Sequence, residues 1–219
     1  MTWTLHSAWR AGAPYRVRIG LQLKGAAYDY APVDLIAGQQ REPAYRAVNP
    51  QGLTPALDLG DGHVLAQSLA ILEWLEETIP QPPILPKAPL DRAMVRRMAG
   101  IIACDIHPLN NTRVGRKLSK MGVEQAAITA WIHGWIRDGF DALEPLVAAH
   151  GGAFAFGDFP TIADCCLVPQ VYSARRFELD VSPWPALVGA ADRAAQHPAF
   201  VAAHPNNQPD APPSAKVSA

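Results

Sequence analysis

The stretch from Ser7 to Gly25 holds the first residues whose types and spacing could do chemistry. A β-prone run gives way at Ala11–Pro14 to a helical pattern, and proline is tolerated in the first turn of a helix. The sequence therefore predicts a sharp turn from a strand into a helix, here called the elbow (Ala11–Pro14). Such a turn presents the N–H groups of Gly12 and Ala13 and the positive end of the helix dipole. Arg10 adds a positive charge, so the stretch suits an anion or a thiolate.

Two interpretations of this stretch are open from its own residues. It can be an ordinary strand-to-helix turn with an exposed arginine, or it can be part of a binding site. A second motif, Thr161-Ile-Ala-Asp164, has the spacing of a capping box with an acidic residue at its fourth position. We interpret this motif as the structural start of a buried helix.

The overall composition excludes several classes of protein. The chain has 219 residues, 49% hydrophobic and 18% charged, which is typical of a globular protein with one large or two modest domains. Its net charge is −1 and it has no basic block, so nucleic acid and anionic membrane surfaces are poor partners. No apolar run approaches the ~20 residues of a membrane helix, and the N-terminus lacks a signal-peptide pattern. We therefore expect a cytoplasmic protein.

The cysteines and histidines do not indicate a metal site. Cys104, Cys165 and Cys166 cannot all pair, and their apolar surroundings predict reduced core residues. There is no C-x-x-C motif, and the seven histidines show no metal-ligand spacing. No G-x-G-x-x-G motif follows the first strand, which excludes a Rossmann nucleotide-binding domain.

The first 80 residues predict a small mixed sheet with helices packed on it. Helices are expected to begin at Pro14 and at Ser68, while residues 34–47 are expected to be irregular with one helical turn. Gly60-Asp61-Gly62 has the chemistry of a hairpin turn between two short strands. The β-prone runs predict strands at residues 3–6, 28–33, 56–59 and 63–65.

Five prolines within residues 80–89 separate this part from the rest of the chain. Beyond them β-prone alternation is absent, and the tail holds four prolines and few apolar residues, so we expect it to be loose. Helices are expected at residues 90–105, 123–149, 163–172 and 184–195. The predicted division is an α/β domain at 1–80, a linker at 81–89, an all-α domain at 90–204 and a loose tail at 205–219.

Five segments together resemble the zeta-class glutathione transferases, and within them the bacterial maleylacetoacetate and maleylpyruvate isomerases. The resemblance covers about residues 5–210, and five motifs in the correct order are specific although each alone is weak. It implies a thioredoxin-like α/β domain followed by an all-α domain, in a cytoplasmic homodimer. The five segments are RAGAPYRVRIGLQLKG (10–25), NPQGLTPAL (49–57), QSLAILEWLEE (67–77), CDIHPLNNTRV (104–114) and TIADCCLVPQVYSARRF (161–177).

The resemblance implies that three segments of the first domain hold glutathione. Thr54 precedes Pro55, which matches the cis-proline of the thioredoxin-like fold, so the Thr54 backbone would hold the cysteinyl part. Gln67 and Ser68 match the pair that holds the γ-glutamyl end, because a hydroxyl and helix N–H groups suit a carboxylate. A plain N-cap role of Ser68 is compatible with this. Gln40 matches a residue that contacts the glycyl end.

Residues of the all-α domain are implied to form the other wall of the site. His107, Asn111 and Arg113 fall in the matching segment, although a lone histidine on an apolar helix is more often a core residue than a ligand. Arg10 and Arg176 match positions that grip substrate carboxylates, for which a planar guanidinium is suited. Either Arg176 or its neighbour, the arginine at position 175, is expected to be surface charge only.

The elbow departs from the family pattern. The family carries Ser-Ser or Ser-Gly-Thr after the arginine, so that a hydroxyl steadies the glutathione thiolate, whereas this chain has Ala11, Gly12 and Ala13. The thiolate would then depend on the backbone N–H groups of the helix start, on the helix dipole and on Arg10.

The implied activity is glutathione-dependent cis–trans isomerisation of a small maleyl diacid, with glutathione as a recycled cosubstrate. Two alternatives stay open. One is a glutathione transferase or dehalogenase acting on small electrophiles, and the other is a glutathione-binding protein without useful catalysis. The absent hydroxyl is the main argument for the second alternative.

Overall fold

The computed structural model describes residues 2–216, which divide into two compact units. The first unit contains the chain up to Ile84 together with the segment from His197 onward. The second unit runs from Leu85 to Gln196. The boundary at Ile84 lies inside the predicted linker.

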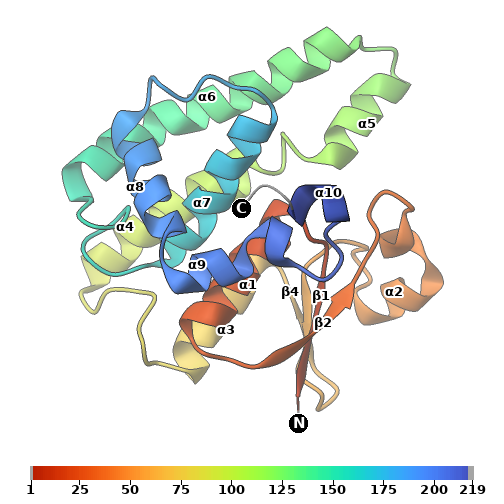
Figure 1. The fold of residues 1–219 in the computed structure, drawn as a ribbon, viewed down its shortest axis with the longest axis horizontal. Helices are drawn as coiled ribbons and strands as arrows, with labels where there is room; N and C mark the ends of the chain where they lie inside the picture. Colours follow the sequence, from red (N-terminus) through yellow and green to blue (C-terminus); the bar gives the residue numbers. More distant parts are fainter. Residues whose placement is uncertain (1, 217–219) are drawn as a thin grey trace. The chain divides into compact units, whose positions relative to one another are not determined.

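A four-stranded mixed sheet forms the centre of the first unit (Figure 1). The strand order is β2-β1-β3-β4, in which β1 is parallel to β2 and antiparallel to β3, and β4 is antiparallel to β3. The parallel pair needs a crossover connection, which the helix after the elbow supplies. The strands are β1 (Trp3–Ser7), β2 (Tyr28–Pro32), β3 (Ala56–Asp58) and β4 (Val64–Ala66).

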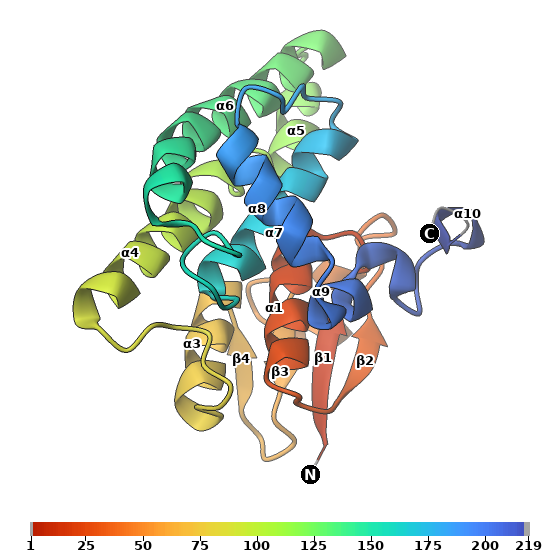
Figure 2. The same cartoon turned by 60° about the vertical axis from the view of Figure 1, so that its left-hand side comes forward.

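Two long helices of the first unit pack together beside the sheet (Figure 2). They are α1 (Gly12–Leu23) and α3 (Ser68–Thr78), and a Cβ added at Gly20 of α1 would lie 2.3 Å from Leu72 of α3. Glycine at this position therefore allows the close approach. The core between the helices and the sheet consists of Leu5, Val17, Leu21, Leu57, Ile71 and Leu75.

Short helical segments complete the first unit. Between β2 and β3 they replace the single helical turn that the sequence predicts at residues 34–47. At the end of the chain, α9 packs against α1. The segments are η1 (Gln39–Arg41), α2 (Pro43–Val48), α9 (Pro198–Ala203), η3 (Pro205–Asn207) and α10 (Pro213–Lys216).

A buried ion pair attaches the proline-rich segment to the first unit. Lys24 Nζ lies 2.6 Å from the Glu76 carboxylate and also donates to the Pro82 carbonyl at 2.7 Å. The same carboxylate accepts from the Ile84 N–H at 2.9 Å. The last residues before the boundary are therefore tied to both α1 and α3.

The second unit consists of helices, with α7 packed against both α4 and α8. The all-α class predicted for this part of the chain is confirmed. The single helix expected at residues 90–105 is an α-helix followed by a π-helix, and α5 was not predicted. Eleven of the 15 residues of α7 are buried. The elements are α4 (Pro89–Gly100), η2 (the π-helix Ile101–Ile106), α5 (Thr112–Lys120), α6 (Gln125–His150), α7 (Ile162–Arg176) and α8 (Pro185–Ala195).

The predicted capping box at the start of α7 is confirmed. The Thr161 hydroxyl accepts from the Ala163 N–H at 3.2 Å, and the Asp164 carboxylate accepts from the Thr161 N–H at 2.8 Å. Asp164 also accepts from the Thr161 hydroxyl and from the Ala155 N–H, so it joins the preceding loop to the helix. Burial raises the pKa of Asp164 to about 6. The interpretation of this motif as structural agrees with these contacts.

The end of the chain differs from the predicted division. Residues from His197 group with the first unit rather than with the all-α domain, and residues 205–216 form η3, a loop and α10 rather than a loose tail. Low apolar content misled the prediction, because polar contacts hold this segment, as described below. Residues 217–219 of the predicted tail lie outside the described residues. Among the described residues no helix combines the length and apolarity needed to cross a membrane.

We expect Asp164→Ala to lower the free energy of unfolding by about 2–4 kcal/mol, because it leaves buried N–H donors without an acceptor. Asp158→Ala is the matched control, since Asp158 is exposed and its carboxylate accepts a 3.2 Å bond from the Ala153 N–H. Urea unfolding of both variants measures the difference. Equal losses would show that the capping box adds nothing beyond a surface contact.

Candidate functional site

The elbow forms where β1 ends and α1 begins, as predicted. Ala11 takes the N-cap position with φ −77° and ψ 131°, and its carbonyl accepts the first helical bond from the Tyr15 N–H at 3.1 Å. Gly12 and Ala13 precede that bond, so their N–H groups belong to the helix start that has no intrahelical acceptor. Arg10 is exposed, with its guanidinium carbon 4.9 Å from the centre of the Trp9 ring. The elbow thus offers backbone donors beside a cation.

The loop before β3 is held by side chains of α2 and of the residue after it. The Thr54–Pro55 bond is cis, as the resemblance implied. The Leu53 carbonyl accepts from the Tyr45 hydroxyl and from the Asn49 side-chain amide, both at 2.7 Å. Burial raises the pKa of Tyr45 to about 12. Two side-chain donors therefore hold the carbonyl that precedes Thr54.

The start of α3 combines a helix N-terminus with a buried cation. Gln67 is the N-cap and Ser68 is the first helical residue, so Ser68 is not itself the N-cap. Arg16 of α1 is 2% exposed and donates from Nη1 to the Ser68 hydroxyl oxygen at 3.3 Å. Because that oxygen accepts, the Ser68 proton can be donated to another group. Helix dipole and guanidinium together favour an anion at this point.

Gln67 has an unusual backbone conformation. Its φ of 69° and ψ of 114° lie outside the regions that non-glycine residues normally occupy. Its side chain donates to the Gln51 side-chain oxygen at 2.9 Å, which connects the start of α3 with the loop before β3. Strained backbone of this kind collects at functional sites.

Gln40 lies next to the same loop. A Cβ at Gly52 would lie 2.9 Å from the Gln40 carbonyl, and Gly52 has a positive φ of 65°, so glycine is required there. The Gln40 side-chain oxygen is buried and has no hydrogen-bond partner within the described residues. Contacts thus link Gln40, the Thr54 loop, Gln67 and Ser68 into one region of the first unit.

In the second unit, the predicted residues after the π-helix lie close together. Asn111 is the N-cap of α5, where its side-chain oxygen accepts from the Arg113 N–H at 3.0 Å. The Asn111 amide nitrogen is 3.5 Å from His107 Nε2. Arg113 is exposed. Asn111 therefore has a structural role as a helix N-cap, and its role in binding stays a prediction.

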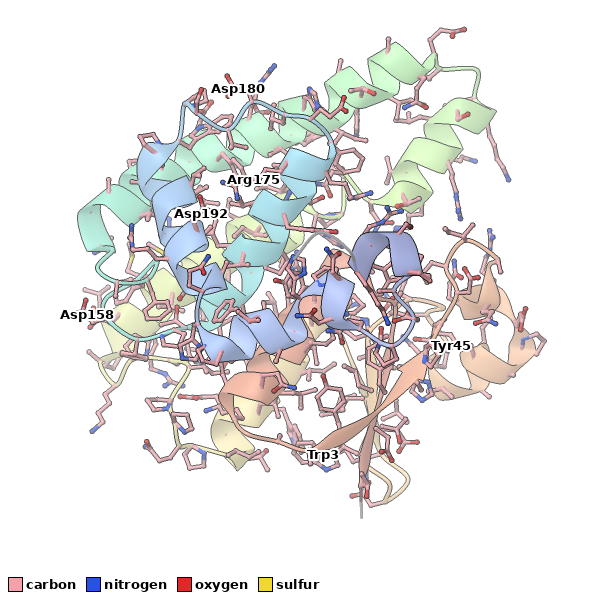
Figure 3. All side chains as sticks on the ribbon, in the orientation of Figure 1. Trp3, Tyr45, Asp158, Arg175, Asp180 and Asp192 are labelled. Atoms are coloured by element: carbon pink, nitrogen blue, oxygen red, sulfur yellow. The ribbon has the colours of Figure 1, made fainter. Side chains whose placement is uncertain are left out.

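The structure distinguishes Arg175 from Arg176 at the end of α7. Arg175 makes two bonds to the Asp192 carboxylate of α8, at 2.6 and 2.8 Å, and these bonds raise its pKa (Figure 3). Arg176 is exposed, with its guanidinium carbon 4.4 Å from the centre of the Phe177 ring. Both terminal nitrogens of Arg175 donate to Asp192, which gives this side chain a structural role in joining α7 to α8. The role of Arg176 as a carboxylate grip stays a prediction from the family resemblance.

Two other expectations concern metals and cysteines. The described residues contain no group of three His, Cys, Asp or Glu side chains that could hold a metal ion. Cys165 and Cys166 are buried and reduced, as predicted, but Cys104 is exposed, so its placement in the core was wrong. Cys104 lies in the π-helix, whose wider turns shift side chains from the positions that a regular helical period predicts.

Sequence reasoning missed Arg16. The only signal was two arginines spaced by one residue, Arg16 and Arg18, in an otherwise apolar helical stretch. Side chains two positions apart on a helix point to nearly opposite sides, so such a pair cannot both lie on one exposed face. This spacing could have indicated at least one buried cation.

The first unit is a mixed sheet with two helices whose N-termini could each bind an anion, and an all-α unit follows it in the chain. This combination defines the glutathione transferase fold. The family model of the glutathione S-transferase N-terminal domain matches residues 14–78. The chain is 47% identical to maleylacetoacetate isomerase of Pseudomonas aeruginosa over 95% of its own length and 98% of the relative. It is 50% identical to maleylpyruvate isomerase of a Ralstonia species over 94% of its own length and 98% of the relative.

Solved structures give the same result. A zeta-class maleylpyruvate isomerase in its holo form is 47% identical, with a TM-score of 0.93 over 95% of this chain and 100% of that one. Maleylacetoacetate isomerase of Anaeromyxobacter dehalogenans with bound GSH is 44% identical, with a TM-score of 0.88 over 96% of this chain and 98% of that one. The chain therefore belongs to the zeta-class glutathione transferases, in the family of the maleylacetoacetate and maleylpyruvate isomerases.

The backbone of Gln67 generates a stability prediction. Gln67→Gly is expected to stay within about 1 kcal/mol of the wild type, because glycine adopts a positive φ without a Cβ penalty. Gln67→Val should lose about 1–2 kcal/mol through backbone strain. Gln51→Ala removes the side-chain bond to Gln67 and serves as the control in the same thermal and urea unfolding series. If the glycine variant were as unstable as the valine variant, the inference that the Gln67 backbone is strained would be contradicted.

Proposed function

We propose that this protein is a glutathione-dependent cis–trans isomerase of a small maleyl diacid, of the maleylacetoacetate or maleylpyruvate kind. One observation carries the proposal: full-length likeness to both isomerases, at 47% and 50% identity, includes the region around Thr54, Gln67 and Ser68. We further propose a cytoplasmic homodimer, which is supported by the family alone.

The residues of the first unit fit glutathione. The Ser68 hydroxyl and the N–H groups at the start of α3 would hold the γ-glutamyl carboxylate, with the buried Arg16 behind them. The Thr54 backbone would hold the cysteinyl part. Gln40 would contact the glycyl part, whose peptide N–H could donate to the Gln40 side-chain oxygen that is buried without a partner in the described residues. The peptide is thus expected to lie along the region linked by these contacts.

The elbow would hold the glutathione sulfur without a hydroxyl. Ala11 has none, so Gly12 and Ala13 would donate from their backbone. A helix start contributes up to about 2 kcal/mol to an anion in a partly buried site, or at most roughly 1.5 pKa units of the thiol. Because the thiol pKa would need to fall further for full ionisation at neutral pH, Arg10 is assigned the remaining part.

The other residues would act on the substrate. When bound, glutathione supplies a thiolate that adds reversibly to the maleyl double bond and so allows rotation from cis to trans. Arg10 and Arg176 would hold the two substrate carboxylates and stabilise the charge that develops during the reaction. His107, Asn111 and Arg113 would instead contribute to glutathione binding from the second unit.

A single assay separates this function from its alternatives. Maleylacetoacetate and maleylpyruvate are each incubated with enzyme, with and without glutathione, and conversion to the fumaryl isomer is measured. We expect conversion of at least one acid that requires glutathione. Conjugation of a chloronitrobenzene without isomerisation would favour a transferase. Glutathione binding detected by calorimetry without any turnover would favour a non-catalytic binding protein. The absence of a hydroxyl at the elbow is the argument for that alternative.

Arg176→Ala is expected to raise the KM for the maleyl diacid about tenfold or more, because a charge-assisted bond to a carboxylate is lost. KM for a neutral chloronitrobenzene should change little. Arg175→Ala is the matched control, since Arg175 already pairs with Asp192. The proposed role of Arg176 would be contradicted if Arg176→Ala raised KM equally for both substrates. It would also be contradicted if Arg175→Ala raised KM for the diacid more than Arg176→Ala does.

A further inference from the structure

The end of the chain packs onto the first unit beside the elbow. In Figure 2, α9 lies along α1. After α9, the chain continues toward the C-terminal end of β2. The loop that leads from β1 into the elbow, residues 8–10, is here called the approach loop. Two side chains connect it to the C-terminal segment, one from α1 and one from the C-terminal segment itself.

Arg18 of α1 makes the first connection. Its guanidinium donates to the Trp9 carbonyl at 2.8 Å, to the Ala8 carbonyl at 3.4 Å and to the Ser7 hydroxyl at 3.1 Å. Its Nε donates to the Ala203 carbonyl of α9 at 3.0 Å. Arg18 is fully buried, and burial lowers its pKa, but an arginine remains protonated at neutral pH. One cation therefore ties the approach loop to α9.

Asp210 makes the second connection. One carboxylate oxygen accepts from the Trp9 N–H at 3.0 Å, and the other accepts from the Tyr30 hydroxyl of β2 at 2.7 Å. Both peptide groups of Trp9 are thus held, the N–H by Asp210 and the carbonyl by Arg18. The Ala11 N–H then donates to the Ala8 carbonyl at 3.1 Å, which closes the turn into the elbow.

We propose that Arg18 and Asp210 are positioning residues for the glutathione thiol. They act through Trp9, whose two neighbouring peptide groups lead directly into Arg10 and the elbow. The assignment rests on the proposed function, because it places the glutathione sulfur at the elbow. Its physical reason is that a site without a hydroxyl depends wholly on where backbone N–H groups and Arg10 point. Residues 197–211 are then part of the glutathione site in function, although they need not touch the ligand.

The test uses Asp210→Ala in the full chain. Ultraviolet absorbance of the bound thiolate is titrated against pH, and glutathione binding and thermal unfolding are measured on the same samples. We expect the pKa of bound glutathione to rise by about half to one unit, so that the thiolate fraction falls about three- to tenfold below both pKa values. A lower melting temperature with an unchanged thiol pKa would overturn the proposal, since a purely structural contact predicts that result.

Three further variants make the result specific. Ser68→Ala should weaken glutathione binding without shifting the thiol pKa, because it acts at the γ-glutamyl end. Asp29→Asn changes an exposed carboxylate on the same strand as Tyr30 and should leave both quantities unchanged. Should Asp210→Ala fail to fold, Tyr30→Phe removes one of the two bonds to Asp210 and should shift the thiol pKa in the same direction by a smaller amount. No shift in Tyr30→Phe would then count against the proposal.

The two proposals fail in different ways. Binding of glutathione without isomerisation of either diacid would overturn the proposed function, while the thiol titration would still measure the effect of Asp210. Isomerisation with a thiol pKa that Asp210→Ala does not move would overturn the positioning role alone. No heat of binding at millimolar glutathione would overturn both.

Discussion

Burial of two guanidinium groups on α1 is the constraint on which the proposed glutathione site depends. A buried cation is costly unless hydrogen bonds replace its water, so its partners must stay in place. Arg16 and Arg18 are 2% and 0% exposed. Two positions apart on a helix, they point to nearly opposite sides. Arg16 reaches Ser68 at the start of α3, and Arg18 reaches the approach loop and α9.

Helix α1 therefore positions both ends of the proposed site. Its own N-terminus supplies the backbone donors at the elbow, and its arginines hold the residues on either side. Gly20 allows α3 to approach closely enough for the Arg16–Ser68 bond, because any Cβ there would collide with Leu72. Rigid support of this kind matters most where catalysis depends on the direction of backbone N–H groups rather than on a side-chain hydroxyl.

In the second unit, carboxylates rather than guanidinium groups hold the elements in place. Asp164 fixes the start of α7, and Asp192 holds Arg175 near its end. These contacts anchor α7 at both ends, and Arg176 lies in its last turn. Burial of Asp164 raises its pKa to about 6, which shows the cost of placing this carboxylate inside the protein.

The sequence by itself determined the strands of the first unit, the capping box and the family, because each depends on neighbouring residues or on motifs in order. Only the tertiary structure decided that Arg175 pairs with Asp192, that Cys104 is exposed and that residues 205–216 pack on the first unit. Arg16 and Ser68 are 52 residues apart, Arg18 and Ala203 are 185 apart, and Trp9 and Asp210 are 201 apart. Hydrogen bonds over such separations leave no local pattern, since propensity and periodicity report only on residues a few positions away.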